Sequence, residues 1–358
     1  MGILITFHTH SDEGIASEIV RGGLEKFISA LYHAFDDVEI VQITKQDRAN
    51  RRAKQITEAK IMAMVPDLIL INELGHYNHV KNFGIRTIVV CHEPLDRSIR
   101  HLAYAKIIRE IVANGDHLYF VSERQFMHYQ AQMKRISDLD LTRDHIKGFF
   151  NPSYCQDMPY SEAREHECLT VGRNSPDKDP FHLHRIMQGH GASLIITDDP
   201  IYKGEGHNAY VAKNRDWVSP QNTLRDLPHP EVLDIISKSK VYVSTCPVES
   251  WGITALESFG CGVPLVIATD KTGKHSSEGI APDISHYIKV PKNASNEEFR
   301  DAIETMAAMS SAKRREMSDM TTEKHSFKNW KKQFDNAFNL RYNENSRTFE
   351  GSTLENFF

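Results

Sequence analysis

The chain has 358 residues, of which 40% are apolar and 25% are charged, with 43 Lys and Arg residues against 48 Asp and Glu residues. A single hydrophobic core rarely extends over so long a chain, so we expect two domains. The composition excludes a wholly disordered or fibrous protein. The sequence contains no apolar run of about 18 residues, so we predict no transmembrane helix. The net charge of −5 argues against a uniformly basic nucleic-acid binder, although local basic patches remain compatible with it.

The N-terminal residues and the cysteines both bear on the cellular compartment of the protein. The first residues, MGILITFHTHSDEG, lack a basic segment followed by a long apolar segment, so we predict no secretory signal. The five cysteines are odd in number and form no C-x-x-C pair, which predicts reduced and mostly buried thiols. We therefore expect a cytoplasmic protein.

Short β-branched apolar runs alternate with helical periodicity, a pattern typical of parallel sheets that are covered by helices. Ser122, with Gln125 three residues later, predicts a helix N-cap. A further helix is expected over 15–32. In the N-terminal half of the chain, the apolar runs predict strands at 3–7, 38–44, 67–72, 86–92, 118–122 and 145–151.

Residues 152–167 carry two prolines, many polar side chains and no periodicity, which indicates a linker. A last helix is expected over 311–340, followed by a tail over 341–358 without regular elements. Between the linker and this last helix we predict strands at 168–172, 193–197, 210–218, 240–245, 264–268 and 287–290. We predict helices there near 181–189, 231–239, 252–259 and 296–309. The expected fold class is α/β with two doubly wound domains, at 1–155 and 165–325, followed by a C-terminal helix and tail at 326–358.

Ligands of open parallel sheets bind beyond the carboxyl ends of the strands, so the loops after strands should carry the chemistry. The segment ESWGITALE places Glu249 and Glu257 eight residues apart across a strand–loop–helix junction. Between them, Gly252 permits close approach of a ligand to the backbone, and the amides of Ile253 and Thr254 would face an anion at a helix N-terminus. Two isolated glutamates at this spacing are usually solvated, so the surrounding sequence decides their meaning.

The stretch 249–266, ESWGITALESFGCGVPLV, resembles the donor-site signature of retaining glycosyltransferases of the GT-B fold, especially family 4. The stretch 171–178, VGRNSPDK, is similar to the GR-x4-K motif of the same family. The resemblance covers the C-terminal half well and the N-terminal half in outline. It implies two Rossmann-like domains that face a central cleft, with the acceptor on the first, a nucleotide-sugar donor on the second, and a C-terminal helix that returns toward the first.

The resemblance also implies roles for single residues. Arg173 and Lys178 match the basic pair that stabilises the departing diphosphate, and Glu249 matches the carboxylate that contacts the transferred sugar. Glu257 matches the carboxylate that binds the nucleotide ribose, while Gly252, Ile253 and Thr254 match the backbone segment near the donor phosphates. Trp251 stands where the family often has Phe or Pro, which would reshape the sugar pocket.

Two loops of the N-terminal half extend the predicted site. After the first strand, Gly14 is the best match to the family's glycine near the diphosphate, although its usual paired glycine is absent. His8 and His10 in the same loop are read as surface or acceptor contacts rather than metal ligands. His92 resembles a histidine that reaches the transferred sugar, with a partly buried strand-end histidine as the alternative, and Glu93 is a candidate acceptor contact.

We predict no metal and no further cofactor. The two Asp-x-Asp strings, 138–140 and 177–179, lie in a polar loop and within the GR-x4-K motif, so neither requires a metal. No GxGxxG motif with a following acidic residue is present, which argues against a nicotinamide dinucleotide site. The expected donor is a nucleotide-diphosphate sugar of the UDP or GDP type.

The acceptor stays open between two classes. Residues 45–60 contain six basic and two acidic residues, including Arg51 and Arg52, which is most often a solvated helix face. As a binding patch, it would suit DNA with a hydroxymethylated base, since phage enzymes that glycosylate such DNA share this fold. The alternative is an anionic glycan or lipid-linked acceptor at a membrane surface, which a bulky Trp or Phe beside the basic run would support, and none is there. A protein that binds a nucleotide or sugar without transferring it is the alternative of another class.

Overall fold

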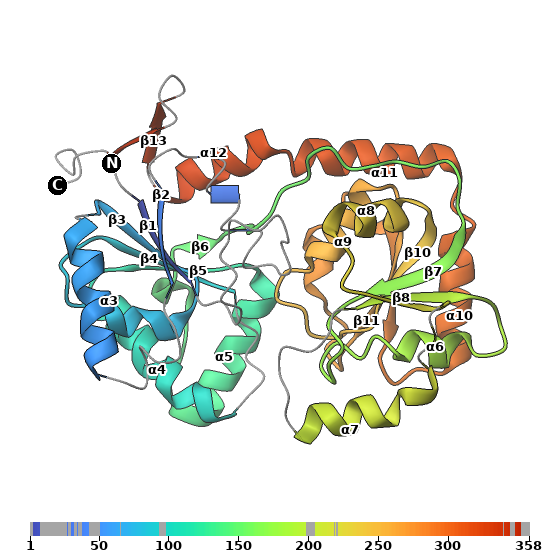
Figure 1. Ribbon diagram of the computed structural model, residues 1–358, viewed down its shortest axis with the longest axis horizontal. Helices are drawn as coiled ribbons and strands as arrows, with labels where there is room; N and C mark the ends of the chain where they lie inside the picture. The colour runs from blue at the N-terminus through green and yellow to red at the C-terminus, as the bar shows by residue number, and fades with distance from the viewer. Residues whose placement is uncertain are drawn as a thin grey trace. The chain divides into compact units, whose positions relative to one another are not determined.

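The computed structural model describes residues 3–7, 38–42, 51–64, 66–92, 98–197, 205–217, 219, 221–338, 340–343 and 348–351, together with Phe27, Ala30, Leu31 and Ala34. The chain forms two compact units, each built around its own sheet. Unit 1 comprises Met1–Ser153 and Lys328–Phe358, and unit 2 comprises Tyr154–Phe327. Figure 1 shows the sheets with helices packed around them.

The sheet of unit 1 has six parallel strands in the order β2-β1-β3-β4-β5-β6. The central strands are short runs of β-branched and aliphatic residues, and every residue of β3 and β4 is buried. Burial on both faces is expected when helices cover a parallel sheet. The strands are β1 (Ile3–Phe7), β2 (Val38–Gln42), β3 (Leu68–Ile71), β4 (Thr87–Cys91), β5 (His117–Phe120) and β6 (Gly148–Phe149).

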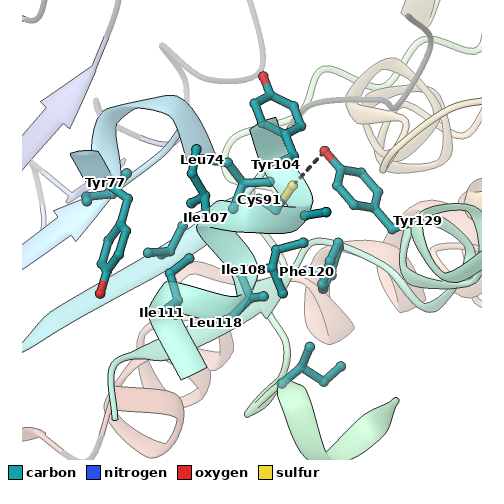
Figure 2. Packing of buried hydrophobic residues seen from close by; sticks show 14 of the residues in the cluster. Leu74, Tyr77, Cys91, Tyr104, Ile107, Ile108, Ile111, Leu118, Phe120 and Tyr129 are labelled. Atoms are coloured by element: carbon teal, nitrogen blue, oxygen red, sulfur yellow. Dashed lines mark hydrogen bonds between the residues drawn. The ribbon is translucent and has the colours of Figure 1, made fainter. Parts of the chain in front are cut away.

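One core of unit 1 lies where helices pack on alternate residues of these strands. It joins Leu118 and Phe120 of the sheet to Ile108 and Tyr129 of the helices (Figure 2), and the Cys91 thiol donates to the Tyr129 hydroxyl at 3.2 Å. The helical elements are α3 (Arg51–Met64), η1 (Leu74–His79), α4 (Ser98–Ala113), α5 (Glu123–Ser137) and η2 (Arg143–His145).

The end of the chain completes unit 1 with α12 (Phe327–Phe338). Trp330 and Phe334 of this helix are buried and pack against the Phe150 ring, at centroid distances of 6.2 and 5.6 Å. The Trp330 indole donates to the Asn151 carbonyl at 3.0 Å, which satisfies its polar atom within the apolar contact. Two antiparallel strands follow, β13 (Leu340–Asn343) and β14 (Thr348–Gly351).

Unit 2 contains a second sheet of six parallel strands, in the order β12-β11-β10-β7-β8-β9. From β7 the chain adds strands on one side as far as β9, then returns to the other side of β7 and continues from β10 to β12. The direction of winding therefore reverses between β7 and β10. The strands are β7 (His166–Val171), β8 (Ser193–Thr197), β9 (Thr223–Arg225), β10 (Ser239–Ser244), β11 (Leu265–Thr269) and β12 (Tyr287–Pro291).

Helices bury both faces of this second sheet. Alternate residues of β10 point to opposite faces, so that Tyr242 joins one core cluster and Val241 and Val243 join the other. The helical elements are α6 (His182–Met187), α7 (Glu205–Lys213), η3 (Arg215–Trp217), α8 (His229–Ser237), α9 (Ile253–Gly260), η4 (Ser276–Gly279), η5 (Ile284–His286), α10 (Asn296–Ala307) and α11 (Ser311–Lys324).

The predicted α/β class with two doubly wound sheets is confirmed, as are most of the strands. The Ser122 N-cap is confirmed as well, because its hydroxyl accepts from the Gln125 amide at 3.1 Å. The strand expected at 210–218 is wrong: its first residues belong to α7 and the next to η3, while the real edge strand is β9. Only isolated residues of the helix expected at 15–32 are described.

Two expectations at the C-terminal end are corrected. The single helix expected over 311–340 is divided between α11 and α12. The break lies at His325, whose ring bonds to the Ile280 carbonyl at 3.1 Å and whose own carbonyl accepts from the Cys155 amide at 2.8 Å. The tail expected to lack regular elements contains β13 and β14. No helix in the described part of the chain is both long and apolar enough to cross a membrane.

Candidate functional site

The site begins where the winding of unit 2 reverses, at the carboxyl ends of β7 and β10. A reversal leaves a crevice between the two loops that follow these strands, and open α/β sheets bind their ligands there. The loop after β7 carries Arg173 and Lys178, and the loop after β10 carries Glu249. The topology thus brings both predicted motifs to one edge of the sheet.

Lys178 and Glu249 form an ion pair, with the ammonium donating to Oε1 of the carboxylate. Both side chains are about one-fifth exposed, so water screens the pair only in part. Burial opposes the charge on each group, but the partner outweighs it, which raises the pKa of Lys178 and lowers the pKa of Glu249. Both groups are therefore charged at neutral pH.

The backbone around Lys178 is held from two sides. The Thr245 hydroxyl at the end of β10 donates to the Lys178 carbonyl at 2.7 Å, which ties the two loops together. The next residue, Asp179, accepts from Arg185 at 2.7 Å and from the Tyr210 hydroxyl at 3.0 Å. These bonds position the ammonium before any ligand arrives, which reduces the reorganisation that binding requires.

His275 performs the same task for the loop that carries Glu249. It is 3% exposed, its Nε2 lies 2.9 Å from the Cys246 carbonyl, and its Nδ1 accepts from the Ser277 amide. These partners require a neutral ring protonated at Nε2, and burial lowers the pKa of His275 in the same sense. The ring therefore joins η4 to the start of the Glu249 loop.

The helix α9 points its N-terminus to this edge of the sheet. Gly252, its N-cap, has φ of 92°, and an added Cβ would lie 2.6 Å from the Ser277 hydroxyl oxygen. A glycine is required on both counts. No side chain caps the helix through Gly252, so Ile253 and Thr254 present their backbone amides at a terminus suited to an anion.

Glu257 lies one turn further along α9 and is 6% exposed. Its Oε1 lies 2.8 Å from Nε2 of His229, the first residue of α8. A buried carboxylate that is oriented by a neighbouring imidazole can accept hydrogen bonds from the hydroxyls of a ligand. The sequence identified Glu257 but gave no reason to select His229.

Arg173 is half-exposed and pairs with Asp177 at 3.2 Å. Both carboxylates of the 177–179 string are therefore in ion pairs, Asp177 with Arg173 and Asp179 with Arg185. In the described part of the chain, no three His, Cys, Asp or Glu side chains are grouped so that they could hold a metal ion. The Cys246 thiol, whose pKa burial raises to about 11, is neutral at physiological pH.

Of the residues predicted for the site in unit 1, His92 is described. His92 follows β4, its ring lies 4.9 Å from the Phe27 ring, and its buried Nε2 has no hydrogen-bond partner among the described residues. Burial lowers the pKa of His92 to about 3, so the imidazole is neutral at physiological pH. The other predicted residues of this region, His8, His10, Gly14 and Glu93, lie outside the described residues.

Arg51 and Arg52 open α3, where both side chains are exposed. They share the exposed surface of this helix with Ile56, Met62 and Met64, which are 51%, 46% and 42% exposed. The surface is therefore both cationic and apolar. The basic stretch alone predicted its charge but not the exposure of its apolar residues.

The described part of the site offers a consistent set of chemical groups. A fixed ammonium, a guanidinium and a helix N-terminus can stabilise negative charge, and two oriented carboxylates can accept from hydroxyls. Such a set suits a polyhydroxylated ligand that carries phosphates. Sequence reasoning missed Thr245, His229 and His275, because single polar residues in loops carry no pattern.

Comparison with known proteins agrees with this reading. Residues 162–324 match the sequence family described as "Glycosyl transferases group 1". No protein with a curated function matches the chain by sequence.

Solved structures resemble nearly the whole chain. Sucrose-phosphate synthase from Thermosynechococcus elongatus matches with a TM-score of 0.71 and 12% identity, over 95% of this chain and 98% of that one. Anabaena HepE, in complex with UDP and glucose, matches with a TM-score of 0.68 and 12% identity, over 95% and 99%. Trehalose-6-phosphate synthase OtsA matches with a TM-score of 0.67 and 12% identity, over 95% and 99%.

At 12% identity these likenesses show the fold alone. The sheets of the two units and these structures confirm the predicted GT-B fold. The chain therefore has the GT-B fold, and its residues 162–324 match the glycosyl transferases group 1 family.

Proposed function

We propose that the protein is a retaining glycosyltransferase that moves a sugar from a nucleotide-diphosphate sugar to an acceptor hydroxyl. The observation that carries the proposal is the Lys178–Glu249 pair, which lies at the winding reversal of a glycosyl transferases group 1 domain. That position combines a phosphate-binding cation with a sugar-binding carboxylate. Retention is proposed from the resemblance of 249–266 to the donor signature of retaining enzymes.

In this proposal the nucleotide binds to unit 2. Glu257, oriented by His229, accepts from the ribose hydroxyls. The diphosphate binds at the N-terminus of α9 with Arg173 and Lys178, whose charges stabilise the departing nucleotide. No metal or further cofactor is needed, because these cations and amides supply the positive field. The proposed donor is of the UDP or GDP type, in keeping with the UDP bound to the HepE structure.

The transferred sugar is held by Glu249, whose lowered pKa keeps it an acceptor for sugar hydroxyls. The acceptor hydroxyl attacks from the face that the diphosphate leaves, so that the configuration of the anomeric carbon is kept. The C1–O bond to the phosphate breaks, the new C1–O bond forms, and the diphosphate oxygen takes the proton of the acceptor. His92, which is neutral and whose Nε2 has no hydrogen-bond partner among the described residues, is proposed as a sugar contact because it resembles the family's histidine.

For the acceptor, the α3 surface favours a lipid-linked or anionic glycan over DNA. Arg51, Arg52 and the exposed Ile56, Met62 and Met64 combine cationic and apolar groups, as helices that bind membrane surfaces do. DNA with a hydroxymethylated base remains the second acceptor class, because the arginines alone suit phosphates. Flotation with anionic vesicles and a gel shift with modified DNA separate the two, and M62Q/M64Q, which removes apolar groups without changing the charge, should weaken only vesicle binding.

The activity is tested by measuring nucleoside diphosphate released from a panel of UDP and GDP sugars by the purified chain. The wild type should hydrolyse one donor slowly, and Lys178→Ala or Glu249→Ala should reduce this at least about 100-fold. Lys240→Ala is a matched control, because Lys240 pairs with Glu167 on the same strands β10 and β7, at their amino ends. Turnover by Lys178→Ala at the wild-type rate would refute the assignment, and donor binding without turnover would indicate a binding protein.

A further inference from the structure

A groove of about 530 Å3 lies in unit 1, and none of the residues that line it belongs to the predicted site. Its walls come from β6 with the residue before it, from β5, and from α12. Both β6 and nearly all of α12 belong to unit 1. The volume falls in the range of small-molecule sites, roughly 300 to 1,000 Å3. Nothing in the proposed transfer reaction uses this groove.

The α12 wall is polar and repeats with helical spacing. Asn329, Lys332, Gln333 and Asn336 stand at i, i+3, i+4 and i+7, so they share one face of the helix. The opposite face carries the buried Trp330, whose bond to Asn151 and packing on Phe150 fix the rotation of the helix. The polar face is therefore held toward the groove by the core on the other side.

The β6 wall is an edge strand of only two residues. Gly148 has φ of 149°, and an added Cβ would meet only the Tyr119 ring, at 4.0 Å, so the floor of the groove is open. Lys147 stands before Gly148, with its side chain exposed, and Phe149 follows, half-buried. An aromatic ring, an exposed backbone edge and a lysine thus face the carboxamides of α12.

The charge of the groove has one sign. Among the described residues that line it, two are lysines, Lys147 and Lys332, and none is acidic. Arg86 adds to the positive field near β5, because together with Lys147 it lowers the pKa of His117, which burial already lowers, to about 4. The groove therefore attracts anions, while its carboxamides can both donate to and accept from hydroxyls.

We propose that this groove binds an acidic oligosaccharide, a short sugar chain that bears carboxylate or phosphate groups. The carboxamides of Gln333 and Asn336 match the hydroxyls, and the two lysines match the acidic groups. A nucleic-acid strand fits less well. Sites for single strands use aromatic rings on which bases stack, and the Phe149 ring already has the Arg143 guanidinium 4.5 Å from its centroid. The proposal does not depend on the transfer activity.

The test measures binding of α-1,4-linked trigalacturonic acid to the full chain by calorimetry, with maltotriose as a neutral probe and hexathymidylate as a nucleic-acid probe. Trigalacturonic acid should bind at least about tenfold more tightly than either of the others. The double variant K147Q/K332Q should weaken its binding at least about tenfold, and Asn336→Ala should weaken binding of both sugars.

The matched control is K106Q/K134Q, which neutralises two exposed lysines on α4 and α5 of the same unit and should leave binding unchanged. Melting temperatures equal to that of the wild type show that each variant is folded. The proposal is overturned if trigalacturonic acid does not bind, if K147Q/K332Q binds it as the wild type does, or if hexathymidylate binds more tightly. If Lys178→Ala loses donor hydrolysis but binds trigalacturonic acid as the wild type does, the groove and the donor site are independent binding sites.

Discussion

Lys178 and Glu249 stand 71 positions apart in the chain, and the ammonium of one donates directly to the carboxylate of the other. The contact exists because β7 and β10 are neighbours in the sheet although two strands separate them in sequence. A second cross-strand pair, Lys240–Glu167, joins the amino ends of the same two strands at 2.5 Å. One pair therefore lies at the ligand-binding edge, and the other offers an internal reference at the opposite edge.

Removing one member of the inner pair should destabilise unit 2. Lys178→Met leaves the mostly buried Glu249 carboxylate without its cation, which should cost about 3 kcal/mol. The more exposed Lys240→Met should cost less than about 1 kcal/mol. Urea unfolding of K178M, E249Q and the double variant K178M/E249Q measures this. A loss in the double variant equal to the sum of the single losses would show that the two groups do not interact.

The same pair should give a defined pH dependence. The pKa of Glu249 is lowered in the folded state, so its contribution is complete above the ordinary value near 4.5 and is lost as the pH falls through the folded pKa. The pKa of Lys178 is raised, so its contribution is complete below about 10.5 and is lost as the pH rises through the folded pKa. The stability difference between the wild type and K178M/E249Q should therefore be constant from pH 5 to 10. A difference that changes steadily across this range would contradict the assigned charges.

Gly252→Ala should be costly for two separable reasons. The left-handed φ alone should cost about 1 kcal/mol, and the Cβ must also displace the buried Ser277 hydroxyl. Gly273→Ala carries a similar φ of +65° with nothing within 4 Å, so it isolates the conformational term. Gly279→Ala, in open space, should be nearly neutral. Thermal unfolding ranks the three, and equal losses for Gly252 and Gly273 would show that the contact with Ser277 is not strained.

Glu257→Gln should impair recognition of the ribose specifically. The wild type should bind UDP or GDP at least about tenfold more tightly than the matching 2′,3′-dideoxynucleotide, because the hydroxyls donate to the carboxylate. Glu257→Gln should bind both nucleotides with nearly equal affinity, and the surface variant Glu231→Gln on α8 should behave as the wild type. Calorimetry with the two nucleotides decides the point. Undiminished discrimination in Glu257→Gln would place the ribose elsewhere.

His92 should remain neutral in mildly acidic solution. Burial lowers its pKa to about 3, so the neutral form is favoured on folding, and the folded state loses stability as the pH falls from about 6.5 toward 3. The nitrogen chemical shifts of the imidazole, followed by NMR from pH 7 to 4 with His92→Gln for assignment, should show no protonation. A midpoint near 6.5 would mean that the ring is solvated and would weaken its role as an uncharged sugar contact.

The fold was largely predictable because its strands are buried on both faces. LILI and TIVVC are continuous apolar runs whose only stable place is the interior of a sheet covered by helices. The residues from 210 to 218 misled the prediction, since their apolar residues suit a strand. Tertiary contacts override this, because Tyr210 in α7 binds Asp179, and Asn214 in the turn after α7 binds Arg185.

The site was predictable only where it carries a motif. Arg173, Lys178, Glu249 and Glu257 stand in recognisable patterns, and unit 2 brings the loops that carry them to one edge of its sheet. The groups that orient them were not predictable. His275 acts through a bond to Cys246, which lies 29 positions away, and nothing in KTGKHSSEG distinguishes it from a solvated histidine.

The central claim is that a nucleotide-diphosphate sugar binds at the carboxyl ends of β7 and β10. The most direct measurement is the melting temperature of the wild type and of Lys178→Ala with each of a panel of nucleotide sugars, with Lys240→Ala as the control. The account predicts that at least one donor raises the melting temperature of the wild type and the control by several degrees, and leaves that of Lys178→Ala unchanged. No shift with any donor, or an equal shift in Lys178→Ala, would contradict it.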